Sequence, residues 1–173
     1  MKQIYFVLTD TNTPISKIIK YFMKDEFSHV SISLDKNLNS MYSLGRLKPY
    51  NPLHGGFVHE YVDKGTFKRF YKTKSMINYI NVTDEQFEKL EKTIEETWNR
   101  RKEIKFNTIG LFAVYFKKKR KKENYFYCAE YIKYATEKSN IDLNLPELPR
   151  PENFKYLDGS KVIYKGLLKE YCK

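Results

Sequence analysis

The sequence predicts an α+β fold in which an antiparallel sheet is flanked by helices. Three observations support this prediction. Short apolar or alternating runs typical of strands recur along the chain, helix-capping residues stand between some of them, and turn residues join neighbouring runs closely enough for hairpins. With 173 residues and 41% apolar side chains, the chain is expected to form one domain over residues 1–173. We expect its core at about 3–138 and a C-terminal extension at about 139–173.

The first third of the chain predicts a buried strand, a helix and a hairpin. Thr13 before Pro14 combines an N-cap residue with a proline suited to the first helical position, so a helix is expected to about Lys24. Its buried face is expected to contain Ile15, Ile18, Ile19 and Phe22. The alternating run that begins at His29 predicts a half-buried strand, and a turn connects it to a returning strand at 40–45.

The later elements follow from capping signals and composition. Two prolines and a Gly-Gly pair predict an irregular loop at 48–56. The capping box formed by Thr83 and Gln86 predicts a long helix to about Lys102. Further strands are expected at 57–62, 66–71 and 76–82, another helix at 125–137, and a short strand and helix near Leu167.

The composition is strongly basic. Lys and Arg number 32 against 21 Asp and Glu, a net charge of +11, which favours an anionic surface or polymer as a partner. The most basic run is expected to be a solvated loop or a rim that steers anions, and it contains Lys117, Lys118, Lys119, Arg120, Lys121 and Lys122. Aromatic residues follow this run, but no nucleic-acid motif accompanies them, so nucleic acid ranks second among the anionic partners.

Other sequence features limit the location and chemistry of the protein. No apolar stretch is long enough for a transmembrane segment, and the N-terminus lacks the features of a signal peptide, so a cytoplasmic location is expected. Only Cys128 and Cys172 are present, which favours a reducing compartment without a structural disulfide. No cysteines and histidines have zinc-like spacing, and we expect neither a metal nor a cofactor.

Two residues are candidates for nucleophilic catalysis. Cys128 falls in the first turn of a predicted helix, where unsatisfied backbone N–H groups and the positive end of the helix dipole stabilise a thiolate. A strand-borne imidazole such as His29 could act as its base, and the helix N-terminus could bind an oxyanion. Taken singly, each residue also has an ordinary structural explanation, the cysteine as a small buried apolar residue and the histidine as a hydrogen-bonded strand residue.

The order of the two short motifs adds weight to the catalytic interpretation. Ser28-His29-Val30 precedes Cys128-Ala129-Glu130, and this pattern resembles the circularly permuted NlpC-type papain-like proteins, relatives of cell-wall peptidases and amidases. The resemblance covers most of residues 3–138 and implies a papain-like fold with Cys128 as nucleophile and His29 as base. Papain-like enzymes that are not permuted place the cysteine first.

The residue that orients the imidazole is less well defined by the sequence. Permuted relatives often place Glu or Gln near the position of Ser43, so Ser43 departs from that pattern. Glu60 is the nearest acidic candidate on a later strand, although a solvated strand residue is its usual explanation. Either Ser43 or Glu60 could orient the ring.

The sequence therefore predicts a cysteine hydrolase, a peptidase or amidase, acting on an amide or ester of a small peptide- or acyl-containing substrate. A lipid-directed thiol acyltransferase or esterase of the lecithin:retinol acyltransferase type has the same residue order. A non-catalytic basic module that binds nucleic acid or membranes is the other alternative, and the three differ in whether binding or turnover needs Cys128.

Overall fold

The structure of the chain is a computed structural model that describes residues 1–107 and 124–171. Within these residues the strands form one sheet in the order β7-β6-β4-β3-β2-β1-β5-β8. All neighbouring pairs are antiparallel except β6 and β7, which are parallel. The strands are β1 (Lys2–Asp10), β2 (His29–Ser33), β3 (Met41–Lys48), β4 (Asn51–Glu60), β5 (Lys74–Val82), β6 (Lys105–Phe106), β7 (Tyr125–Phe126) and β8 (Lys161–Leu167).

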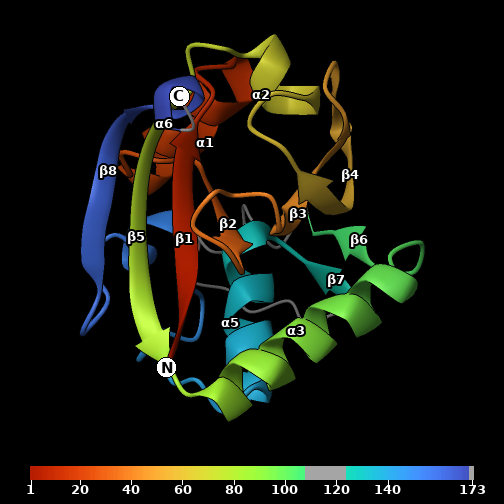
Figure 1. Cartoon of the computed structure of the whole chain (residues 1–173). Helices are drawn as coiled ribbons and strands as arrows, with labels where there is room; N and C mark the ends of the chain where they lie inside the picture. The colour runs from red at the N-terminus through yellow and green to blue at the C-terminus, as the bar shows by residue number, and fades with distance from the viewer. Residues whose placement is uncertain (108–123, 172–173) are drawn as a thin grey trace.

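Five α-helices and one 3-10 helix accompany the sheet in the described part of the chain. They are α1 (Pro14–Met23), α2 (Gly65–Arg69), α3 (Asp84–Asn99), α5 (Cys128–Lys138), η1 (Pro151–Phe154) and α6 (Leu168–Tyr171). Figure 1 shows α3 at one end of the molecule and α2 and α6 at the other, with α5 lying against the middle of the sheet. The mixed α+β class with a mostly antiparallel sheet is therefore confirmed.

Alternating side chains of the central strand β1 fill two apolar clusters on opposite faces of the sheet. Ile4, Phe6 and Leu8 belong to the larger cluster, which also contains the buried side of α3 and α5. Tyr5 and Val7 point the other way, into the cluster beneath α2 and α6. The sheet is thus buried on both faces along β1, which explains why its sequence is apolar rather than alternating.

Capping signals predicted two helix starts correctly. The Thr13 hydroxyl accepts a hydrogen bond from Ser16 N–H at the start of α1, and Thr83 and Gln86 form a reciprocal capping box at the start of α3. The prediction for 125–137 was wrong at its beginning, because Tyr125–Phe126 forms β7 and the helix starts at Cys128. The expected C-terminal strand and short helix are present as β8 and α6.

The irregular loop expected at 48–56 was wrong, because β3 and β4 form a long hairpin through this region. The ladder is irregular between Arg46 and Lys48, opposite Pro52, and a bulge of this kind accommodates a proline. Gly55 supports close packing, since a Cβ at this position would come within 2.8 Å of Phe106 Cβ.

The strand expected at 66–71 was also wrong, because α2 occupies most of this segment. Aromatic and β-branched residues favoured a strand, but Phe67 and Phe70 are three residues apart, which suits one side of a short helix. Phe67 is buried in the cluster beneath α2, so tertiary packing decided the conformation.

The buried face expected for α1 is only partly confirmed. Ile19 packs against the larger cluster, but Ile18 is 46% exposed and Phe22 is 40% exposed. The side chain of Ile15 is not among those that the structure describes. The amphipathic pattern located the helix correctly but not the direction in which its apolar side faces.

Candidate active site

The side chains of His29 and Glu60 form a close pair. His29 is the first residue of β2, Glu60 is the last residue of β4, and His29 Nε2 lies 3.3 Å from Glu60 Oε2. The same carboxylate oxygen accepts hydrogen bonds from Ser31 Oγ at 2.5 Å and from Ser43 Oγ at 2.8 Å. Both side chains are largely buried, 20% exposed for His29 and 10% for Glu60. The carboxylate is therefore fixed by two hydroxyl donors as well as by the imidazole.

Adjacent strands place this pair. His29 pairs with Thr9 of β1, and Ser31 follows two residues later on the same face of β2. Glu60 pairs with Met41 of β3, and Ser43 lies two residues further along that strand. A polar cluster thus runs across three neighbouring strands.

Gly45 gives the carboxylate room to reach the imidazole. A Cβ at Gly45 would come within 3.1 Å of Glu60 Oε1 and 3.2 Å of Ser43 Oγ. Gly45 pairs with Gly56 across the β3–β4 ladder, so neither strand has a side chain at this position. The Glu60 side chain lies over the space that a larger residue at 45 would occupy.

Cys128 is the first residue of α5 and is 3% exposed. The short strand β7 before it is held by β6: Asn107 N–H donates to Phe126 C=O at 2.8 Å, and Lys105 N–H donates to Asn124 C=O at 2.9 Å. Glu130 in the first turn accepts a 3.4 Å hydrogen bond from Tyr127 N–H. A strand edge on one side and the helix on the other thus fix the cysteine at the helix N-terminus.

The Cys128 side chain lies near the His29 imidazole, close enough to influence its pKa. Burial alone lowers the pKa of His29, but the Glu60 charge, the nearby Cys128 and the contact with the Glu60 carboxylate outweigh it and raise the pKa to about 10. For Glu60, burial alone raises the pKa, but the His29 charge and the three hydrogen bonds to the carboxylate outweigh burial, so the pKa is lowered overall. The structure thus favours a charged His29–Glu60 pair at neutral pH.

The structure brings four of the sequence candidates together, but their relation differs from the expectation. Ser43 and Glu60 were alternatives for orienting the ring, whereas Glu60 contacts His29 and Ser43 contacts Glu60. The solvated-strand explanation of Glu60 was wrong, because three polar side chains surround its carboxylate. Ser31 was missed, although its position two residues after His29 on an alternating strand was a usable signal.

The other sequence candidates lie elsewhere. His59 Nε2 is 2.6 Å from the Asn39 carbonyl oxygen and its ring stacks on Tyr42, while His54 is exposed. The basic run at 117–122 lies outside the described residues, as does Cys172. Across residues 1–107 and 124–171, no three His, Cys, Asp or Glu side chains are grouped to hold a metal ion.

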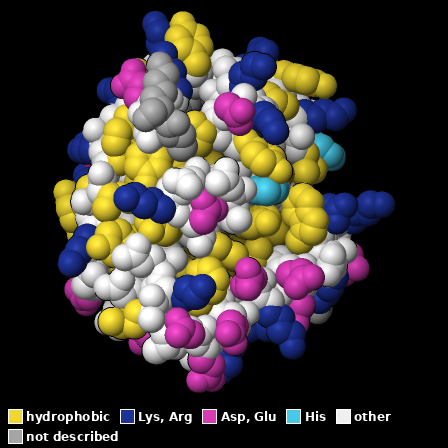
Figure 2. Space-filling view, viewed as in Figure 1, with side chains coloured by type: hydrophobic (Ala, Val, Ile, Leu, Met, Phe, Trp, Pro, Cys, Tyr) yellow, Lys and Arg dark blue, Asp and Glu magenta, His cyan; other side chains and the backbone are white. Residues whose placement is uncertain are grey.

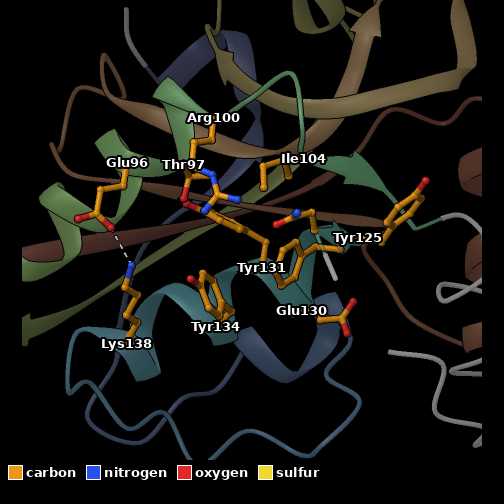
Figure 3. Close-up of a pocket in the computed structure, with 11 residues that line it drawn as sticks. Glu96, Thr97, Arg100, Ile104, Tyr125, Glu130, Tyr131, Tyr134 and Lys138 are labelled. Atoms are coloured by element: carbon orange, nitrogen blue, oxygen red, sulfur yellow. Dashed lines mark hydrogen bonds and ion pairs between the residues drawn. The ribbon is translucent and has the colours of Figure 1, made fainter. Parts of the chain in front are cut away.

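A cavity of about 720 Å³ lies between α3 and α5. Figure 3 shows Thr97 of α3 and Arg100, just after this helix, on one side of it and Tyr131 and Tyr134 of α5 on the other, with the Glu96–Lys138 ion pair at one end. Residues on both sides of Cys128 in the sequence also line the cavity, namely Tyr125, Phe126 and Glu130. The cavity thus adjoins the start of α5, although Cys128, His29 and Glu60 are not among the residues that line it.

No protein-family model matches this chain, and no curated protein sequence matches it.

Proposed function

We propose that this protein is a cysteine hydrolase or acyltransferase of the permuted papain-like type, acting on an amide or ester. The observation that carries the proposal is the position of the His29 imidazole, which contacts the Glu60 carboxylate and lies near the Cys128 side chain. A nucleophile, a base and a group that orients the base are the elements of acyl transfer by a thiol. The helix start at Cys128 and the order of His before Cys further support the papain-like assignment.

Each residue has a definite role in the proposed mechanism. Glu60 binds Nε2 of His29, which leaves the other ring nitrogen, Nδ1, to exchange a proton with the thiol in this mechanism. Cys128 reacts as the thiolate of a thiolate–imidazolium pair, in which His29 holds the proton that the thiol has given up. The thiolate attacks the acyl carbon, and the imidazolium delivers its proton to the leaving amine or alcohol. Water or a second acceptor then attacks the acyl-enzyme as His29 takes a proton from it. The Cys128 backbone N–H, at the helix N-terminus, stabilises the oxyanion in both steps.

The cavity between α3 and α5 is proposed to bind part of the substrate. Aromatic rings of Phe126, Tyr131 and Tyr134 line it and contact one another, with Phe126 and Tyr134 ring centres 5.2 Å apart. Such walls favour an apolar or aromatic group on the substrate. The catalytic residues themselves suit both a peptide amide and a lipid ester.

The proposal is tested by the rate at which a fluorescent iodoacetamide labels each cysteine at pH 7, followed by peptide mapping. Cys128 should react at least about tenfold faster than Cys172, and His29→Ala should remove that preference. His54→Ala is the matched control, because His54 is exposed and lies outside the pair. Equal rates at the two cysteines, or a preference that survives His29→Ala, would contradict the proposal.

A further inference from the structure

Helix α1 exposes an apolar stripe on its outer side. Ile18, Tyr21 and Phe22 are 46%, 80% and 40% exposed. Their spacing of three and four residues places them on one face of the helix, and the Tyr21 and Phe22 rings contact each other edge to face. Contiguous exposed apolar side chains, unlike scattered ones, mark a surface that binds another protein or a membrane.

The stripe lies among basic side chains. Residues 14–24 contain three lysines and no acidic residue, and Lys17 and Lys24 are exposed while Lys20 pairs with buried Asp10. The two acidic residues that follow α1 are already in ion pairs, Asp25 with Arg150 and Glu26 with Lys155 and Lys165. The electrostatic surroundings of the stripe are therefore positive.

A second basic segment adjoins α1. Residues 64–74 contain five Lys or Arg and no acidic residue, and Tyr71 in this segment is 54% exposed. Arg46 connects the two segments: its Nη2 donates to Thr13 Oγ1, the N-cap of α1, at 2.8 Å, and its guanidinium lies 5.2 Å from the Phe70 ring centre. We call the exposed residues of 14–24 and 64–74 the α1–α2 surface.

The acidic residues gather at the other end of the molecule. Helix α3 contains six Asp or Glu and only two Lys. Figure 2 shows acidic side chains along the lower end, over α3, whereas Lys, Arg and hydrophobic side chains predominate at the upper end, near α2. The charge is thus polarised along the molecule, with the apolar stripe in a basic region.

We propose that the α1–α2 surface docks onto an anionic lipid membrane, with Ile18, Tyr21 and Phe22 inserted among the acyl chains and the lysines against the headgroups. An interfacial helix requires this combination of an apolar stripe with flanking Lys or Arg. Nucleic acid satisfies the lysines but offers no apolar phase to cover Ile18 and Phe22. This inference does not depend on the proposed acyl transfer.

The test is sedimentation with vesicles of phosphatidylcholine alone or mixed with phosphatidylserine. The full-length Cys128→Ala chain is used throughout, so that acyl transfer contributes nothing to the result. Binding is expected only with phosphatidylserine present and should fall steeply as the salt concentration rises. I18S/Y21S/F22S should weaken partitioning at least about tenfold, and K17E/K24E should weaken it by a similar factor at low salt.

Matched controls lie outside the α1–α2 surface. Tyr156→Ser removes an exposed aromatic residue, and K92E/K102E reverses two exposed charges at and after α3. Both should bind like the parent, and thermal unfolding confirms that every variant is folded. Four results would overturn the proposal: no binding to the anionic vesicles, unchanged binding of I18S/Y21S/F22S, loss of binding only on neutralising 117–122, or binding to an oligonucleotide but to neither kind of vesicle.

Discussion

His29 is the residue on which the electrostatics of the site depend. Its pKa is raised from 6.5 to about 10, so its contribution to stability is complete below pH 6.5 and is lost as the pH rises through 10. The pKa of Glu60 is lowered, so its contribution is present above its ordinary pKa of 4.5 and is lost as the pH falls through the lowered value. The charged pair therefore stabilises the fold most between about pH 4.5 and pH 6.5, where both contributions are present.

Glu60→Gln tests this coupling. The amide keeps the shape of the side chain but removes the charge, so the pKa of His29 should fall towards its ordinary value. The variant should lose about 1–3 kcal/mol at pH 7, since the imidazole can release its proton instead of remaining an unpaired buried cation. Urea unfolding at pH 6 and pH 10 measures the effect, and the fall in stability between these pH values should be smaller than in the parent.

Glu91→Gln, on the exposed side of α3, is the control for this substitution and should leave the pH dependence unchanged. An NMR titration of His29 gives its pKa directly. The same His29 pKa in the parent and in Glu60→Gln would show that the carboxylate does not control the ring.

Thr9, the ladder partner of His29, offers a second test at this scale. Its hydroxyl is completely buried and has no hydrogen-bond partner among residues 1–107 and 124–171. Because an unsatisfied buried hydroxyl is destabilising, the nearly isosteric Thr9→Val should raise the free energy of unfolding by about 1 kcal/mol. Thr136→Val is the contrast, since that hydroxyl donates to the Ile132 carbonyl at 2.9 Å and its loss should destabilise. Chemical denaturation measures the free energy of unfolding of both variants. Destabilisation of Thr9→Val would mean that the Thr9 hydroxyl has a hydrogen-bond partner in solution.

At the scale of elements, the β3–β4 hairpin shapes the site through its paired glycines. Gly45→Ala should displace the Glu60 carboxylate, because the new Cβ would lie about 3.1 Å from Glu60 Oε1 and from Val58 Cγ2. We expect a several-fold loss of Cys128 alkylation rate. Gly56→Ala, at the paired position, is the control, because the atoms nearest to its Cβ would be those of the flexible Leu47 side chain, at 3.2 Å, and the Ile104 backbone oxygen, at 3.5 Å. Equal rates for the two variants would argue against a role for Gly45 in positioning Glu60.

The elements also show what the sequence could and could not predict. Caps at Thr13 and Thr83 located two helix starts because a cap acts locally, through hydrogen bonds to the next turn. The hairpin at 48–56, helix α2 and the exposed side of α1 were not predicted, because each depends on packing with distant residues. The association of His29 with Glu60 has the same origin, since strand order and the space above Gly45 create it.

At the scale of the whole molecule, the C-terminal residues belong to the same sheet as the N-terminal ones. Strand β8 pairs with β5, and Leu168, which follows it, is 1% exposed in the cluster with Tyr5 and Val7. Leu168→Ala should therefore cost about 2–4 kcal/mol of unfolding free energy. Leu47→Ala removes the same atoms at a 47% exposed position and should cost less than about 1 kcal/mol. Similar losses in urea denaturation would mean that the C-terminal segment is not part of the core.

The chain folds so that His29 of β2 contacts Glu60 of β4 near Cys128 at the start of α5, and we propose that these three residues carry out acyl transfer. Intact-protein mass spectrometry of the Cys172→Ser chain, mixed with an activated acyl ester, tests it most directly. We predict one acyl group on Cys128, formed at least about tenfold more slowly in Glu60→Gln and not detectably in His29→Ala. Acylation confined to lysines would contradict the proposed acyl transfer. So would acylation of Cys128 at the same rate in the Cys172→Ser chain and in its Glu60→Gln and His29→Ala variants.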